Sequence, residues 1–118
     1  MKRDPASALP VKPVDFLILL ALSAGEAHGY ALMRDILERS AGTVRLEAGN
    51  LYRSIRRLLD EGLLAESGRR PAPDADDERR RYYALTPFGR KVVAAEALRL
   101  RTLVRFAEAQ RLIGPEAS

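Results

Sequence analysis

The spacing of apolar residues changes twice along this chain, and these changes restrict what it can fold into. Up to Gly62 the apolar residues recur with the period of an α-helix. The runs Leu63–Ser67 and Arg81–Thr86 are short, and the second alternates in the manner of a β-strand. The helical period then returns from Pro87 to about Ile113. The sequence therefore predicts three helices, a two-stranded hairpin and one long final helix.

Glycine, proline and polar residues predict where these elements begin and end. The first helix contains Phe16 and its apolar neighbours and ends at Gly25, and because it is apolar on nearly every side we expect it to be buried. The second helix spans Tyr30–Ser40, and the third runs from about Glu47 to Glu61. Asn50 is a candidate cap for the third helix, since no Ser, Thr, Asp or Asn occupies positions 46–48. Thr86 followed by a proline is a good start for the final helix.

The order of these elements indicates a fold class. Three short helices followed by a hairpin form the winged version of the helix-turn-helix, whose third helix enters the DNA major groove. We therefore expect a mainly α fold with a small β-hairpin, a winged helix-turn-helix (α-α-α-β-β) plus a long C-terminal dimerisation helix. The expected divisions are a flexible N-terminal arm over residues 1–12, a winged-helix DNA-binding domain over 13–86, a C-terminal dimerisation helix over 87–113 and a tail over 114–118.

Composition removes several other classes of function. The chain has 118 residues, enough for one modest domain, and a formal net charge of +4 that favours a polyanionic partner without identifying one. It has no cysteine and one histidine, His28, so we expect no disulfide, no metal site and no cofactor. The longest apolar run, Val14–Ala24, is about half of a bilayer span, so we expect a cytoplasmic protein that does not contact a membrane.

The residues also give no indication of catalysis. No nucleophile with a base and an orienting group is visible, and no glycine-rich loop for phosphate is present. His28 is better explained as the start of the second helix than as a chemical group. We therefore expect that the protein is not an enzyme.

The third helix separates apolar from basic residues. Leu51, Ile55 and Leu58 recur along one face, which we expect to face the core. The outward face carries the candidate DNA-binding residues Asn50, Arg53, Arg56 and Arg57. Arginine matches guanine or phosphate, and asparagine matches adenine. Tyr52 lies on the border, where its ring can pack in the core and its hydroxyl can reach a phosphate. A basic face can also merely solvate a helix, but a third helix placed before a wing favours DNA binding.

The tip of the predicted hairpin separates its charges in the same way. Arginines lie at both bases of the tip, and the acidic residues lie at its apex between positions 74 and 78. We expect Arg79, Arg80 and Arg81 to contact backbone phosphates. The equal alternative is a solvated loop in which these arginines pair with the aspartates.

The final helix is apolar over an arc too wide for one neighbour. One neighbour covers roughly 100° of arc, so the remainder needs a second surface, most simply the same helix of another copy. The residues predicted to form this dimer interface are Val93, Ala97, Leu100, Val104 and Ala107. Glu96 and Arg99 also fall inside the arc and are candidates to pair across the interface. In the alternative, the helix packs wholly on its own three helices.

Three stretches together resemble a known family. They are HGYAL at 28–32, GNLYRSIRRLLDEGLL at 49–64 and RRYYALTPFG at 80–89. In combination they resemble the PadR family of transcriptional regulators, over roughly Pro13 to Gly89, and the single final helix resembles its short subgroup. The resemblance implies a repressor that binds double-stranded DNA as a homodimer. It also implies that Tyr52 contacts DNA and that Thr86 and Gly89, with Tyr83 and Leu85, are structural positions at the exit of the wing.

The resemblance has departures and leaves questions open. The family usually has threonine where Asn50 stands and often proline where Arg53 stands, so the operator sequence does not transfer. The family often responds to phenolic or drug-like aromatic compounds, which implies a small aromatic effector. Phe16, Phe88 and Phe106 are candidates to line its site, although core packing explains them better. A winged helix can instead dock proteins without sequence-specific DNA binding, but the basic third helix lacks the apolar anchors of such a surface.

Overall fold

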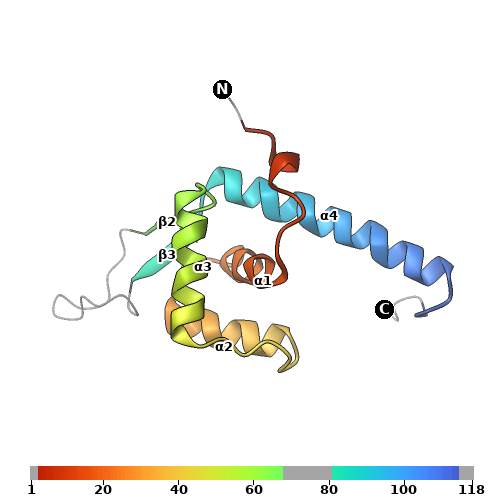
Figure 1. The fold of residues 1–118 in the computed structure, drawn as a ribbon, viewed down its shortest axis with the longest axis horizontal. Coiled ribbons are helices and arrows are strands. Elements are labelled where there is room, and N and C mark those ends of the chain that lie inside the picture. The colour runs from red at the N-terminus through yellow and green to blue at the C-terminus, as the bar shows by residue number, and fades with distance from the viewer. Residues whose placement is uncertain (1–2, 68–80, 115–118) are drawn as a thin grey trace.

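The computed structural model describes residues 3–67 and 81–114 and is mainly helical with a small antiparallel sheet (Figure 1). The predicted mainly α class with a small β element and a long final helix is confirmed. The elements in chain order are a 3-10 helix η1 (Pro5–Ala8), α1 (Pro13–Leu22), β1 (Ala27–His28), α2 (Gly29–Arg39), α3 (Ala48–Asp60), β2 (Leu64–Glu66), β3 (Tyr82–Leu85) and α4 (Pro87–Ala109).

The core is built around α1, which Figure 1 shows end-on, with α3 to its left, α2 below it and α4 above it. Ile18 and Leu19 of α1 are fully buried, as are Ile36 of α2, Leu51 of α3 and Val92 of α4. A helix that is apolar on nearly every side can contact all its neighbours in this way, which explains why the shortest of the α-helices lies at the centre.

The sheet contains the predicted hairpin and one strand that the sequence pattern did not reveal. β2 and β3 pair antiparallel with Leu64 opposite Leu85, and β1 pairs on the other edge of β3 with Ala27 opposite Tyr83. The order is therefore β1-β3-β2. β1 was missed because it spans two residues, too few to show alternation.

The predicted glycine boundary after α3 is confirmed, but the predicted cap at its start is wrong. At the end, Gly62 adopts a left-handed φ of 77° and the Leu63 amide donates to the carbonyl of Leu58 at 3.0 Å, a Schellman motif. At the start, the N-cap is Glu47, whose carbonyl already accepts the Leu51 amide at 3.0 Å. Asn50 therefore lies inside the first turn, where its side chain is available for other contacts.

The start of α4 follows the predicted pattern of a threonine cap and a proline. Thr86 Oγ1 accepts the Gly89 amide at 2.9 Å and donates to the carbonyl of Gly62 at 2.6 Å. A Cβ on Gly89 would lie 2.0 Å from the carbonyl oxygen of Leu63, so only glycine lets α4 approach the end of α3 this closely. These contacts give Thr86 and Gly89 the structural role that the family resemblance implies.

Both ends of the described chain differ in detail from the sequence expectations. α4 ends at Ala109 rather than near Ile113, because Arg111 takes a left-handed φ of 60° and the Leu112 amide turns back to the carbonyl of Ala107 at 3.0 Å. In the segment expected to be an arm, η1 packs beside α4, and Leu9 and Val11 lie half-buried against the core. No helix within residues 3–67 and 81–114 is long and apolar enough to span a bilayer.

Candidate nucleic-acid interface

The third helix, α3, presents an apolar face to the body and a polar face to solvent. Leu51, Ile55 and Leu58 are at most 1% exposed and pack among α1 and α2. On the opposite side Asn50, Arg53 and Arg56 are exposed. The predicted orientation of the helix is therefore present, with two of its three arginines on the open face.

The open face is formed in the first three turns of α3. Arg53 Nη1 donates to Asn50 Oδ1 at 3.3 Å, so these two side chains lie side by side one turn apart. A Cβ added at Gly49 would meet nothing within 4 Å, so space is open in front of the helix start. The positive end of the helix dipole lies at the same place. Together these groups offer donors and positive charge to an anionic surface.

The third arginine of α3, Arg57, has a different partner. Its Nη1 and Nη2 donate to the two carboxylate oxygens of Asp15 on α1, each at 2.9 Å. The Asp15 side chain is 8% exposed, and burial raises the pKa of its carboxyl although the nearby Arg57 charge opposes that shift. Arg57 thus joins α3 to the central helix, while its side chain stays 38% exposed, so its expected contact with DNA stays a prediction. The signal that sequence reasoning missed was Asp15, a single acid in an otherwise apolar helix.

Tyr52 lies at the junction of α3 and the start of α2. It is 7% exposed, and a Cβ on Gly29 would lie 2.0 Å from its hydroxyl oxygen. Glycine at position 29 is therefore required for the tyrosine to fill this junction. Of the two roles considered for Tyr52, the geometry shows core packing, and its buried hydroxyl does not reach the open face of α3.

His28 begins α2, as the sequence indicated, and also contacts the wing. Its Nδ1 accepts the Ala31 amide at 3.3 Å, which makes it the N-cap. Its ring meets the ring of Tyr82 on β3 edge-on, with centroids 5.3 Å apart. His28 thus fixes α2 and β3 relative to each other.

The wing is described at its base. Arg81 is exposed, and its Nε lies 3.8 Å from Glu66 Oε1 across the hairpin. The other two arginines expected to contact phosphate, Arg79 and Arg80, and the acidic apex lie outside the described residues.

The final helix α4 divides into an embedded half and a projecting half. Val93 is 5% exposed and packs in the core of its own chain, which removes it from the expected dimer interface. Of the other residues expected there, Ala97 is exposed, Leu100 and Ala107 are half-buried, and Val104 is 48% exposed. Figure 1 shows the C-terminal half of α4 extending away from the body. Further apolar side chains are exposed on this half: Leu98, Leu103 and Phe106.

Glu96 and Arg99 pair with each other inside the chain. Arg99 Nε and Nη2 donate to the two carboxylate oxygens of Glu96, each at 2.7 Å. The bond from Arg99 lowers the pKa of the Glu96 carboxyl, and a bond from the Val11 amide acts in the same direction. The candidate pair for the dimer interface instead holds the N-terminal segment against α4.

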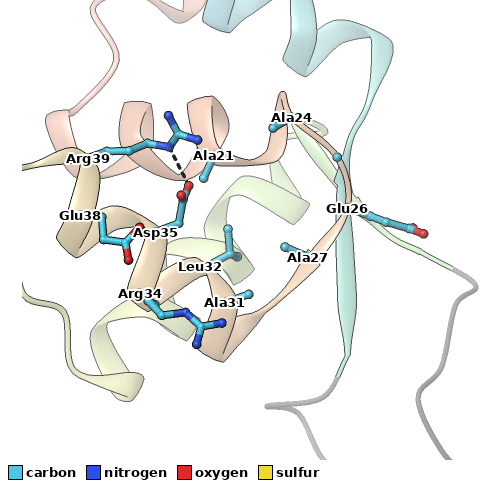
Figure 2. A pocket seen from close by; sticks show the side chains of 11 residues that line it. Ala21, Ala24, Glu26, Ala27, Ala31, Leu32, Arg34, Asp35, Glu38 and Arg39 are labelled. Carbon is cyan, nitrogen blue, oxygen red and sulfur yellow. Dashed lines mark hydrogen bonds and ion pairs between the residues drawn. The ribbon is translucent and has the colours of Figure 1, made fainter.

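A pocket of about 320 Å³ lies between the end of α1, β1 and α2 (Figure 2). Its floor includes Ala21, Ala31 and Leu32, and charged residues of α2 surround it. Two of those charges, Asp35 and Arg39, pair with each other at 2.7 Å. The pocket opens on a different part of α2 from the Tyr52 junction, and its charges are not of one sign.

A buried central helix, a third helix with an open basic face and an antiparallel wing define a winged helix-turn-helix protein. The family model described as "Transcriptional regulator PadR-like family" matches residues 18–95. This match covers more than half of the chain, which therefore belongs to the PadR-like family of transcriptional regulators.

Solved structures of this family have the same fold. A PadR family transcription regulator from Clostridium difficile is 22% identical, with a TM-score of 0.68 over 86% of this chain and 100% of that one. A PadR family regulator from Eggerthella lenta is 27% identical, with a TM-score of 0.62 over 83% of each chain. Bacillus subtilis PadR, solved in complex with operator DNA, is 22% identical, with a TM-score of 0.62 over 74% of this chain and 48% of that one. The comparison with curated proteins found no match.

Proposed function

We propose that this protein is a sequence-specific transcriptional repressor of the cytoplasm that binds a palindromic operator as a homodimer. The observation that carries the proposal is the open face of α3. Asn50, Arg53 and Arg56 project from a helix whose other sides are buried on α1 and α2. An exposed helix anchored in this way can enter a major groove without unfolding any part of the domain.

The chemistry of this face suits duplex DNA. An arginine fork can bind the two acceptors on guanine, and an asparagine amide can bind adenine. Arg81 at the base of the wing adds an exposed positive charge. The structure of Bacillus subtilis PadR with operator DNA supports this use of the fold. Because Asn50 and Arg53 differ from the family pattern, we expect this protein to read its own operator sequence.

The projecting half of α4 supports a homodimer. Leu103 and Val104 are 53% and 48% exposed, and Phe106 is 66% exposed. Burial of such side chains against a second copy stabilises association by roughly 25 cal/mol per Å². A two-fold dimer would place two α3 helices on one side of a duplex, about one helical turn apart. Phe106 is then the aromatic residue best placed to meet a small aromatic effector at the interface.

The proposal is tested by selecting bound duplexes from a random pool and measuring affinity for the enriched sequence. Arg53→Ala and Arg56→Ala should each weaken binding about 5- to 150-fold, since a good base contact is worth about 1–3 kcal/mol. Arg101→Ala, which removes an exposed arginine from α4, is the matched control and should change affinity less than about twofold.

Equal affinities for wild type, Arg53→Ala and Arg56→Ala would overturn the role of α3. Failure to enrich any sequence would favour the alternative, a winged-helix module that binds protein. A melting-temperature screen with phenolic acids tests the effector separately, because a ligand that binds the folded state raises the melting temperature.

A further inference from the structure

The N-terminal segment, residues 3–12, contacts both the end of α3 and the start of α4. Arg3 Nη1 donates to the backbone carbonyl of Glu61, the C-cap residue of α3. The same guanidinium lies over the ring of Phe88 in the first turn of α4, 4.2 Å from its centroid. One side chain therefore contacts both the C-terminal end of α3 and the first turn of α4.

Both contacts have a physical reason to be favourable. The last carbonyls of a helix carry partial negative charge and lack partners within the helix, so a cation that donates to one of them is stabilised. The face of an aromatic ring also attracts a guanidinium. A planar guanidinium can donate in its plane while its face stacks on a ring, and this combination suits arginine better than lysine.

The other end of the segment is attached to α4 as well. The Val11 amide bonds to Glu96, whose carboxylate is almost fully buried and is held by Arg99. Between the two ends, η1 packs beside α4, with Ala8 and Leu9 half-buried (Figure 1). The segment then leads directly into α1, which holds α3 through Asp15 and Arg57.

We infer that residues 3–12 form a brace that fixes α3 relative to α4, with Arg3 as its positioning residue. The inference rests on the proposed function, in which α4 joins two copies and α3 reads DNA. If α4 sets the dimer axis, the position of α3 relative to α4 sets the distance between the two reading helices. The brace would then determine which spacing between half-sites the protein accepts, without touching DNA itself.

The first experiment measures the brace without DNA. The chain has no cysteine, so Asp60→Cys at the end of α3 and Arg105→Cys on projecting α4 introduce two exposed sites for spin labels. Labelled chains are diluted into unlabelled protein so that only the distance within one chain is recorded. We expect one narrow distance distribution in wild type, a broadened or shifted one in Arg3→Ala and an intermediate one in Arg3→Lys.

The second experiment uses the duplex enriched by selection and two variants whose spacer is one base pair longer or shorter. Wild type should bind the altered spacers about tenfold more weakly, since each disrupted base contact costs about 1–3 kcal/mol. Arg3→Ala should reduce this preference to within about twofold, and Arg3→Lys, which keeps the charge without the planar stack, should regain only part of it. A loss of stability alone would lower affinity for all three duplexes equally.

The outcomes separate the brace from the proposed function. An unchanged distance distribution in Arg3→Ala overturns the brace, and an unchanged spacer preference beside a broadened distribution overturns its role in specificity. A wild-type protein that enriches no duplex contradicts the proposed function and the spacing role with it, while the distance measurement still decides whether the brace exists.

Discussion

The two halves of α4 are both rich in apolar residues but have different surroundings. In the first half Val92 and Val93 are at most 5% exposed and pack on the chain's own core. In the second half Leu103, Val104 and Phe106 are about half exposed or more. Both halves are apolar over a wide arc, yet one half completes a domain and the other half extends beyond it (Figure 1). The apolar pattern of a helix thus predicts that its surface is covered, and only the fold shows which part of that surface is covered by the helix's own domain.

The largest effect is expected in the embedded half. Val92→Asp would place an unpaired carboxylate in the core and should lower the free energy of unfolding by about 3–5 kcal/mol, a large share of the roughly 5–15 kcal/mol that stabilises a native domain. The measurement is urea unfolding followed by circular dichroism. Ala94→Asp, two residues away on the exposed side, is the control and should change the unfolding free energy by less than about 0.5 kcal/mol. Equal losses in both variants would contradict the division between the two halves.

The same change in the projecting half should leave the fold intact and dissociate the dimer. Val104→Asp adds a charge to a residue that is 48% exposed in the single chain, so its circular dichroism spectrum should match wild type. Against a second copy that charge would be buried, and we expect the dimer dissociation constant to rise at least about tenfold. Sedimentation velocity over a concentration series measures this. A dimer that is unchanged by Val104→Asp would place the interface elsewhere.

The contributions of the two buried carboxylates, Glu96 and Asp15, to the stability of the fold should depend on pH in opposite directions. The pKa of Glu96 is lowered by the bond from Arg99, so its stabilising contribution is present above the unfolded pKa of about 4.3 and is lost as pH falls through the folded pKa. Wild type should therefore lose its advantage over Glu96→Gln as pH falls from about 4.3 through the lowered folded pKa. The readout is the difference in urea midpoint between the two proteins at each pH.

Asp15 should show the reverse dependence. Burial raises the pKa of this carboxyl, so its contribution is fully present below the unfolded pKa of about 3.9 and is lost as pH rises through the folded pKa. Wild type should therefore gain relative to Asp15→Asn as pH falls through the raised folded pKa toward about 3.9. If the difference in urea midpoint from wild type changed with pH in the same direction for Asp15→Asn and Glu96→Gln, the predicted contrast between the two ion pairs would be wrong.

The smallest effect concerns two residues in left-handed conformations. Ala41 follows α2 with a φ of 53°, and Arg111 follows the projecting end of α4 with a φ of 60°. Ala41→Gly should stabilise the protein by about 0.5–1 kcal/mol, because glycine adopts this conformation without a steric penalty. Arg111→Gly relieves the same strain, but the end of α4 can fray without loss of many contacts. We therefore expect it to raise the free energy of unfolding by less than about 0.5 kcal/mol. Urea midpoints of both variants decide whether the projecting end shares the cooperativity of the core.

Periodicity predicted the helices, the hairpin and the outward face of α3, since each depends on residues within a few turns of one another. The contacts it missed join distant parts of the chain. Asp15 and Arg57 are 42 positions apart, and nothing local marks them as partners. The position of Tyr52 depends on Gly29, because a side chain at position 29 would collide with the tyrosine hydroxyl. This contact joins two helices, so the sequence of either helix alone does not reveal it. Val93 was predicted to lie at the dimer interface because a helical-wheel pattern does not show which apolar residues of a helix are buried by its own domain.

The proposed function requires the start of α3 to lie in the major groove of duplex DNA. Gly49→Cys introduces a single thiol at an exposed position where a Cβ meets nothing within 4 Å, and an iron chelate attached to it cleaves the nearest DNA backbone. On the selected duplex we predict two clusters of cleavage, about 10 base pairs apart, one for each α3 of the dimer. Cleavage that is absent or uniform along the bound duplex, while the same labelled protein remains folded and bound, would contradict the account.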